Sequence, residues 1–505
     1  MTKQKTIKTD ILIYGGTSAG IAAAVAAARR GVRPLLVEAS DHLGGMTTGG
    51  LGDTDVGIAS AIGGISLEFY ERVGKIYGEE NAAWRFEPKV AMQVFSEMLR
   101  EQGVEVLTRE RLDLEKGVVT KDGNIVLVRM ESGLEIEAKR YIDTSYEGDL
   151  MALAGVTYVI GREANALHGE TLNGIRDDNE LPDGVDPYVI PGRPESGLLE
   201  RVNPNRGGEV GDADNGVQAY TYRMCLTDVP ENRAPIYKPV MYREADYEIL
   251  FRAIEQGQTR RFFKLERVPN GKTDSNNDSG ISTDFIGMNH IYPEADYQTR
   301  GSIAAEQTRY QLGLVWTLQN HPRVPEAIRE FYAPWGLPKD EFAGNNHWPT
   351  QLYVREARRM LGEHLITENV VRSKAAVADS IGLGSYAMDS HHIQYCVSEK
   401  GDVTTEGGFY VILDSPYSIS YRSILPRAKE CRNLLVPVCL SATHAAYGSV
   451  RMEPVFMILG QSAATAAALS IQRDCDLHEL PYAVLQAALE NGKQRLHAQP
   501  GACRH

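Results

Sequence analysis

Two polar side chains near residue 450 have the types and positions that redox chemistry on a small molecule needs. His444, in the run SATH, follows a predicted strand over residues 433–438 and precedes a predicted Ala-rich helix over 454–472. An imidazole beyond the carboxyl end of a parallel strand lies where α/β proteins bind ligands, and it can accept a proton near neutral pH. Arg451, in GSVRMEP, offers a cation to a substrate carboxylate. The competing interpretations are a loop-stabilising histidine at 444 and a salt bridge from Arg451 to Glu453.

A pair of adjacent histidines in the run MDSHHIQY gives a third candidate. Neighbouring side chains in a strand point to opposite faces, so one histidine of the pair would face a site on that side. We take His392 as that residue; the alternative is that both His391 and His392 are structural or exposed. No third ligand follows at a metal-binding spacing, so the sequence predicts no metal.

Three arginines fall within a helix predicted over residues 348–366. Residues three and four apart share a helix face, which would stack the side chains of Arg355, Arg358 and Arg359. Stacked cations repel one another and favour a bound phosphate or carboxylate. Pairing with Glu356 and with acids elsewhere is the equal alternative.

Residues 10–38 have the order of elements that a dinucleotide site requires. A short apolar strand over 11–14 leads through the small residues GGTSAG into an Ala-rich helix over 19–30, and a second strand over 34–37 ends at Glu38. Small residues let the backbone approach a pyrophosphate, the helix N-terminus attracts it, and the acid can accept a ribose hydroxyl. The middle glycine of the usual pattern is Thr17 here. The acid disfavours the 2′-phosphate of NADP, and the alternative is a glycine-rich βαβ turn without a ligand.

A second glycine-dense run, LGGMTTGGLG at 43–52, follows the acid. Such a loop suits a flavin, whose ring needs flat backbone walls. Residues 11–57 resemble the opening of the FAD-dependent oxidoreductases related to fumarate reductase and succinate dehydrogenase flavoproteins, in the subgroup with a GGTSAG turn and this loop. Runs similar to that subgroup recur to the end of the chain, at 141–150, 222–233, 269–297, 348–363, 387–395 and 433–469.

The resemblance implies FAD as cofactor, held non-covalently because residues 44–52 contain no histidine to carry it. The implied cofactor-binding residues are Gly15, Gly16, Thr17, Ser18, Ala19, Gly20, Glu38, Ala39, Gly44, Gly45, Met46, Thr47, Gly49, Gly50 and Asp143. Arg451 acquires a second interpretation, as a counter-charge to reduced flavin. The implied catalytic residues are His444, Arg451 and His392.

The predicted fold is α/β, with a Rossmann-like, glutathione-reductase-type FAD-binding domain built on a parallel βαβ sheet and an inserted α+β substrate domain. We expect the first part of the FAD-binding domain at 1–160, the substrate or cap region at 161–400, the C-terminal part of the FAD-binding domain at 401–480, and a tail at 481–505. Residues 118–140 predict an antiparallel excursion. Residues 173–216, rich in Pro, Gly, Asp and Asn, predict a long irregular segment.

The composition of the chain argues against several classes of function. The 505 residues carry 67 acids against 53 bases, a net charge of −14, and no basic stripe, which argues against binding nucleic acid or an anionic membrane. Apolar stretches are short or broken, so no membrane span is predicted. Six scattered cysteines without a C-x-x-C pair, and an N-terminus without an apolar signal core, indicate a cytoplasmic protein with reduced thiols. The oligomeric state, homo-oligomer included, stays open.

The sequence therefore predicts an FAD-dependent oxidoreductase that moves a hydride between flavin N5 and a small polar substrate. The substrate classes considered are a polyol, a sugar derivative or a carboxylate. Whether the enzyme is a dehydrogenase, a reductase or an oxidase is left open. The alternatives are an NAD-linked dehydrogenase that uses the same turn, and a non-catalytic scaffold that FAD stabilises.

Overall fold

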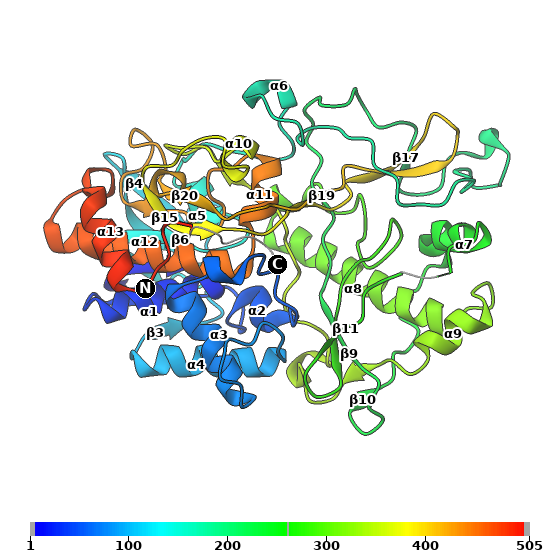
Figure 1. Ribbon diagram of the computed structural model, residues 1–505, viewed down its shortest axis with the longest axis horizontal. Coiled ribbons are helices and arrows are strands. Elements are labelled where there is room, and N and C mark those ends of the chain that lie inside the picture. The colour runs from blue at the N-terminus through cyan, green and yellow to red at the C-terminus, as the bar shows by residue number, and fades with distance from the viewer. Residues whose placement is uncertain (1–5, 260–261, 499–505) are drawn as a thin grey trace.

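A mostly parallel sheet forms the centre of the lobe at the left of Figure 1. The computed structural model describes residues 6–259 and 262–498. The strand order is β3 (Glu105–Leu107), β2 (Pro34–Val37), β1 (Thr6–Tyr14), β6 (Glu135–Asp143), β5 (Asn124–Arg129) and β4 (Val118–Lys121), and β21 (Leu434–Leu435) also pairs with β6. β1, β2, β3, β6 and β21 pair in parallel, whereas β4 and β5 form the predicted antiparallel excursion.

The central strands are buried along their apolar runs because helices pack against the sheet. Helix α1 (Ser18–Arg29) packs on α12 (Glu453–Arg473), and α3 (Gly64–Ile76) and α4 (Pro88–Glu101) pack beside them. The α1–α12 contact is close: a Cβ on Gly460 would lie 2.2 Å from the carbonyl oxygen of Ala19. The small residues of α12 thus serve a helix–helix contact as well as its approach to the sheet.

Helix α12 is also the one helix, among the residues that the structure describes, whose length and apolarity would allow it to cross a membrane. In the folded protein, 89% of the apolar stretch of this helix is buried. That burial is typical of a core helix, and the helix occupies the middle of the first lobe (Figure 1).

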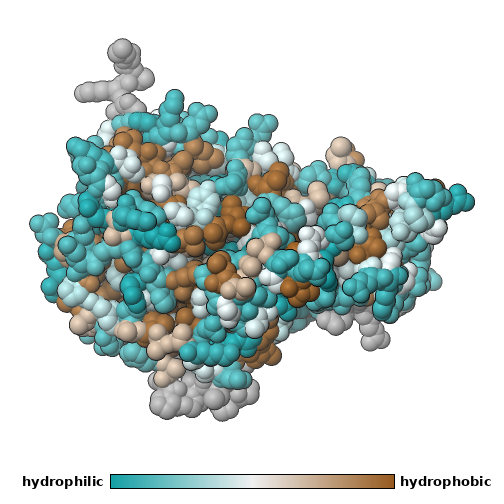
Figure 2. Space-filling view, turned by 90° about the horizontal axis from the view of Figure 1, so that it is seen from above, coloured by the Kyte–Doolittle hydropathy of each residue, from teal (hydrophilic) through white to brown (hydrophobic). Residues whose placement is uncertain are grey.

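The second lobe, at the right of Figure 1 and of Figure 2, carries one long helix, two short helices and small sheets. Its helices are α7 (Glu248–Glu255), α8 (Tyr297–Asn320) and α9 (Glu326–Tyr332). One sheet orders β11 (Glu266–Val268), β12 (Lys272–Ser275) and β9 (Met224–Thr227); another orders β18 (Val403–Glu406), β17 (Gln394–Val397) and β8 (Val202–Asn203). Residues 173–216 are mostly irregular, as predicted.

The chain returns to the first lobe through two strand pairs. β15 (Ser380–Gly384) pairs with β20 (Tyr417–Ser420) and contacts α12; β16 (Met388–Ser390) pairs with β19 (Phe409–Val411) and contacts α11 (His444–Val450). Residues just before 401 therefore already pack on the first lobe. In the expected tail, α13 (Tyr482–Asn491) packs on α12.

The helix predicted over residues 348–366 is wrong. The segment is extended, with only the two-residue strand β14 (Arg359–Met360), which pairs with β7 (Tyr158–Val159). Its backbone N–H groups donate to distant partners: Tyr353 to the carbonyl of Thr221 at 2.8 Å, and Met360 to that of Cys439 at 3.0 Å. Long-range hydrogen bonds have replaced the local ones that a helix would make, because the segment runs between the two lobes.

Candidate functional site

The turn after β1 leaves no room for side chains at its glycines. A Cβ on Gly15, whose φ is +107°, would lie 2.6 Å from the backbone nitrogen of Ser145, and a Cβ on Gly20 would lie 2.0 Å from the carbonyl oxygen of Gly15. Thr17, in place of the usual middle glycine, caps α1: its hydroxyl accepts from the N–H of Gly20 at 3.3 Å and donates to the carbonyl of Thr144 at 2.8 Å. The threonine thus ties the turn to β6 while leaving the helix N-terminus in place.

Glu38 lies at the end of β2 against this turn. One carboxylate oxygen accepts from the N–H of Gly16 at 2.6 Å, and the other accepts from the N–H of Ser40 at 2.8 Å. Asp143 lies at the end of β6, and its carboxylate accepts hydrogen bonds from the segment that follows this strand. The donors are the N–H and hydroxyl of Ser145 and the N–H of Met151. Burial raises the pKa of Asp143 to about 6. Its carboxylate is thus engaged inside the protein.

The glycine-dense run contains a short helix, α2 (Gly45–Gly49), which was expected as a loop. Gly44 and Gly45 have φ of +96° and +55°. A buried carboxylate, Glu453 at the start of α12, ties this run to the core: it accepts from Thr47 at 2.8 Å and from Tyr146 at 2.7 Å. Burial raises the pKa of Glu453.

His444 forms a buried dyad with Glu356. The imidazole Nδ1 lies 2.8 Å from Oε2 of Glu356, and the side chain is 1% exposed. Because a carboxylate only accepts, Nδ1 carries a proton, and a neutral imidazole would then present its lone pair at Nε2. Nε2 is buried and has no hydrogen-bond partner. A buried, unpaired basic nitrogen is what a general base presents to a substrate.

Glu356 is held as a carboxylate. Burial alone would raise its pKa, but His444 and Arg359 beside it lower the pKa to about 2. Arg359 Nε lies 2.6 Å from Oε1, and Gln218 Nε2 donates to Oε2 at 2.7 Å. The backbone N–H of His444, at the first residue of α11, donates to Glu163. These contacts fix the imidazole at both its ring and its backbone.

Arg451 joins the same network. Its Nη1 donates to the Tyr353 hydroxyl at 2.8 Å, and its Nη2 lies 3.1 Å from Asp389 and 3.4 Å from Oε1 of Gln218. The salt bridge to Glu453, which the sequence left open, is not made in the structure; Asp389 takes that place. His444 and Arg451 are thus brought together, with Gln218 bridging their partners.

The adjacent histidines point apart, and His391 is the one that joins this network. His391 Nδ1 lies 2.6 Å from Asp284, and its backbone N–H donates to Gln218. His392 contacts Asp178 at 2.8 Å and Glu180 at 3.3 Å instead. Burial lowers the pKa of His392, but the two carboxylates outweigh it and raise the pKa to about 9.

A histidine with that pKa is protonated at neutral pH and cannot accept a second proton. The catalytic role of His392 therefore stays a prediction, and a protonated imidazole does not support a role as a base.

The three arginines predicted on one helix face are separated, because the helix is absent. Arg355 pairs with Asp284, Arg358 with Asp149, and Arg359 with Glu163 and Glu356. Each guanidinium thus has its own carboxylate, and the common anion site that a helix face would make does not form.

The comparisons decide the family. The family model described as FAD dependent oxidoreductase matches residues 10–489. This chain belongs to the FAD-dependent oxidoreductases. No curated protein matches.

Solved structures similar to this FAD-dependent oxidoreductase include L-proline dehydrogenase from P. horikoshii, with 16% identity, TM-score 0.24, and coverage of 31% of this chain and 58% of that chain. L-amino acid deaminase from Proteus vulgaris matches with 13% identity, TM-score 0.24, and coverage of 32% and 53%. The flavin-dependent brominase Bmp2 matches with 15% identity, TM-score 0.24, and coverage of 31% and 42%. The chain spans just over half the length of the first two.

FAD is the cofactor, and the residues at the turn fit it. The backbone at Gly15, Gly16 and Gly20 is packed too closely to admit a Cβ, and the N-terminus of α1, capped by Thr17, lies in this turn. A pyrophosphate at a helix N-terminus accepts from its N–H groups. The two alternatives considered from the sequence, an NAD-linked dehydrogenase and a non-catalytic scaffold, are set aside by membership of this enzyme family.

Most of the side chains around His444 and Arg451 had no recognisable sequence signal. Glu356 was seen only as a counter-ion, and Gln218, Tyr353, Asp284 and Asp389 were not singled out. They lie on segments far apart in sequence, and only the packing of the two lobes joins them to His444. Glu356 sits between two arginines in VREARRM, a local signal that the helix interpretation obscured.

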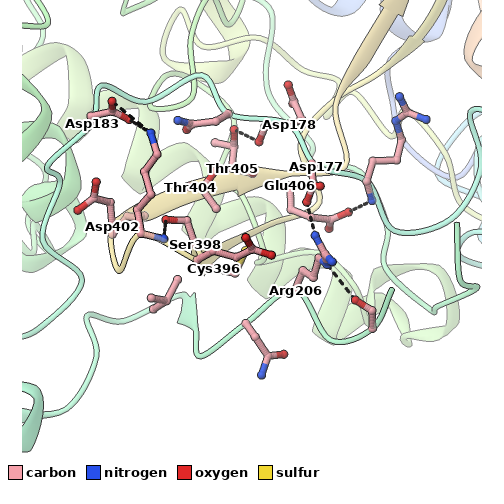
Figure 3. A pocket seen from close by; sticks show the side chains of 18 of the residues that line it. Asp177, Asp178, Asp183, Arg206, Cys396, Ser398, Asp402, Thr404, Thr405 and Glu406 are labelled. Atoms are coloured by element: carbon pink, nitrogen blue, oxygen red, sulfur yellow. Dashed lines mark hydrogen bonds and ion pairs between the residues drawn. The ribbon is translucent and has the colours of Figure 1, made fainter. Parts of the chain in front are cut away.

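A polar cavity of about 750 Å³ lies in the second lobe, over the β17–β18 hairpin (Figure 3). Figure 3 shows Asp177 against Arg206, and Glu406 on the floor. Glu406 is buried and pairs with Arg162 at 2.7 Å. Asp178, which lines this cavity, is one of the two carboxylates that contact His392. His392 is thus placed by the wall of this cavity.

Neither metal nor disulfide chemistry is indicated within the described residues. The one cluster of potential ligands, Glu87, Asp340 and Glu341, surrounds the Lys272 ammonium, 2.6 to 2.7 Å from all three. An ammonium thus takes the place of a metal cation. The described cysteines, Cys225, Cys396, Cys431, Cys439 and Cys475, are free, and Cys503 lies outside the described residues.

Proposed function

We propose that this FAD-dependent oxidoreductase removes a hydride and a proton from a small polar substrate, with His444 as the base. The single observation that carries the proposal is the buried, unpaired Nε2 of His444, whose other ring nitrogen is fixed by Glu356. When bound, FAD supplies a two-electron acceptor at N5 for the hydride that leaves the substrate carbon. The proton that leaves the substrate oxygen or nitrogen goes to His444 Nε2.

The protein's own contribution is orientation and charge. Glu356 keeps the Nδ1–H tautomer of His444 and compensates its positive charge once Nε2 has taken the proton. Glu38 and the Gly15–Gly20 turn would hold the ribose and pyrophosphate of FAD. Residues 44–50 would lie along the ring, because their glycines expose backbone rather than side chains.

The finer assignments are part of the same proposal. We assign the enzyme to a subgroup related to fumarate reductase and succinate dehydrogenase flavoproteins, with a glutathione-reductase-type Rossmann domain, an inserted substrate domain and non-covalent FAD. The repeated motif-like runs and the absence of histidine from residues 44–52 support this. A cytoplasmic location is proposed from the scattered free cysteines.

The test is anaerobic mixing of the oxidised holoenzyme with a panel of polyols, sugars and carboxylic acids while flavin absorbance is followed. We expect His444→Ala to keep bound FAD but to slow reduction by the active substrate at least tenfold, about 1.4 kcal/mol of barrier. His478→Ala is the control, since the ring of His478 hydrogen-bonds to the carbonyl of Pro426 rather than to a residue near His444. Unchanged reduction by the His444 variant would remove the base from the proposal.

A further inference from the structure

One buried ion pair of the second lobe has no role in the proposed reaction. Arg223 comes from the run at 222–233, and Asp274 comes from the run at 269–297. The two residues are 5% and 1% exposed. Nε of Arg223 donates to one carboxylate oxygen of Asp274 at 2.7 Å, and Nη2 donates to the other at 2.8 Å. Paired hydrogen bonds of this kind hold both side chains in one orientation.

The ladder between β9 and β12 brings the pair together. Asp274, on β12, lies opposite Cys225 of β9, and Arg223 lies two residues before Cys225. Residues two apart in an extended chain point to the same side, so Arg223 and Asp274 are diagonal neighbours on one face of this sheet. That face meets the first lobe, because Asp274 there contacts residues 52 and 53.

The pair holds the end of the glycine-dense run, residues 43–52. The Oδ2 atom of Asp274 accepts from the N–H of Gly52 at 2.9 Å and from the N–H of Asp53 at 2.8 Å. The backbone of Arg223 packs against the same run, since a Cβ on Gly50 would lie 2.5 Å from the carbonyl oxygen of Arg223. Because one carboxylate binds two successive N–H groups, the peptide planes on both sides of Gly52 are fixed.

The buried charges of the pair oppose each other. Burial lowers the pKa of Arg223, but Asp274 and Asp55 outweigh this effect and raise that pKa, so the guanidinium is charged. Asp274 is in direct contact with it, whereas the nearest oxygen of Asp55 lies 3.6 Å away. A neutral residue at 274 would make the charge beside the glycine-dense run more positive, and a neutral residue at 223 would make it more negative.

We propose that Arg223 and Asp274 are positioning residues for the flavin, which fix the backbone at the end of the glycine-dense run and, through their opposed charges, set the reduction potential of the ring beside it. A protein tunes a bound cofactor through the charges and hydrogen bonds that surround it. This inference rests on the proposed function only in placing the ring along residues 44–50. It needs neither His444 nor any particular substrate.

The first test measures the effect of charge. The midpoint potential of the holoenzyme flavin is determined anaerobically against reference dyes, at about pH 8, where carboxylates are ionised. Reduction increases the negative charge on the flavin, so Asp274→Asn should raise the potential and Arg223→Gln should lower it. We expect the reduction equilibria of the two variants to differ at least tenfold, which is about 30 mV for a two-electron couple.

The second test measures the hold on the backbone, by hydrogen exchange of the holoenzyme amides at residues 52 and 53. Asp274→Ala removes the acceptor, and these amides should exchange at least tenfold faster than in the wild type. Asp274→Asn keeps an oxygen that can accept from both N–H groups. Its exchange should therefore lie between the alanine variant and the wild type, although its charge has changed.

Asp246→Asn is the matched control, because Asp246 is also buried and pairs with a buried arginine, Arg309, at 2.6 Å. Both residues of that pair belong to the second lobe and contact no part of the glycine-dense run. This variant should keep the wild-type flavin potential and the wild-type exchange at residues 52 and 53, even where its thermal stability is lower. Flavin content and circular dichroism establish that each variant is folded.

The order of the two potentials decides the inference on charge. Equal potentials in Asp274→Asn and Arg223→Gln, or shifts of the same sign, would overturn it, since general damage to the site moves both variants alike. Where one variant fails to fold, the sign of the shift in the other, measured against the wild type, decides. Wild-type exchange at residues 52 and 53 in Asp274→Ala would overturn the positioning role.

Failure of this inference and failure of the proposed function give different results. If no compound on the panel reduces the wild type while the potentials and the exchange behave as expected, the proposed reaction fails and the positioning pair stands. If His444→Ala slows reduction as proposed while both readouts stay at wild-type values, only the positioning pair fails.

Discussion

Replacement of Glu356 by glutamine tests the dyad with the smallest change of shape. The carboxylate accepts from Gln218 and His444 through one oxygen and contacts Arg359 through the other. A glutamine at 356 offers one oxygen and two N–H donors, so it cannot satisfy all three donors. The imidazole would lose its fixed tautomer, and the buried Arg359 would lose one of its two carboxylates.

The magnitudes follow from the pKa of Glu356, about 2 against an ordinary 4.5. At 1.4 kcal/mol for each tenfold change in proton affinity, the folded protein stabilises this carboxylate by about 3 kcal/mol. Because the folded-state pKa is lowered, that stability is present above about pH 4.5 and is lost as the pH falls through 2. We therefore expect Glu356→Gln to lower the free energy of unfolding at pH 7 by about 3 kcal/mol and to flatten its acid dependence. For catalysis, we expect flavin reduction to slow by about 10² to 10⁴-fold, as for the loss of an effective general base.

Chemical denaturation between about pH 2 and 8 measures the first effect, and anaerobic stopped-flow reduction of FAD-loaded protein measures the second. Glu368→Gln is the matched control: Glu368 is buried, accepts from Thr171 and pairs with Arg372, and lies outside the network. It should be destabilised without slowing reduction. Wild-type reduction rates in the Glu356 variant would refute the reasoning, whatever happened to its stability.

Three further outcomes follow from the structure. Gly20→Ala should yield protein without FAD, read as the ratio of flavin to protein absorbance, whereas Gly301→Ala, with open space around it, should retain FAD. The pKa of His392 is raised to about 9 from 6.5, so its protonation stabilises the fold below pH 6.5, and this stability is lost as the pH rises through 9. The free energy of unfolding should fall by about 3 kcal/mol over that range, and His392→Asn should abolish this pH dependence. Lys272→Met should cost about 3 to 5 kcal/mol in denaturation, and the exposed Lys400→Met less than about 1 kcal/mol; equal costs would contradict the buried cluster.

The parts of the fold that could be predicted are those fixed by neighbours in sequence. The turn after β1, helix α1 and strand β2 follow from glycines, alanines and a short apolar run, and their bounds differ little from those predicted. The antiparallel excursion of β4 and β5 was likewise set by its own turn. In each case the hydrogen bonds that define the element join residues close together in the chain or in one βαβ unit.

The helix predicted over 348–366 failed for the opposite reason. Its apolar spacing suits a helix, but both Val354 and Ala357 are also buried when the segment is extended between the lobes. Periodicity reports only which residues are buried, not what buries them. The predicted clustering of Arg355, Arg358 and Arg359 was wrong for the same reason, because it assumed the geometry of a helix and the segment is extended.

Most of the site exists only because the two lobes pack together. Asp284 comes from the second lobe, and His444 and Arg451 come from the first. The contact between the lobes has its own buried charges, since Asp149 of the first lobe holds Arg300 of α8 at 2.5 Å. The contacts of Asp284 with Arg355 and His391 span the two lobes, so they exist only in the packed molecule. That dependence explains why sequence patterns predicted the turn after β1, which one βαβ unit builds alone, and did not predict the partners of His444.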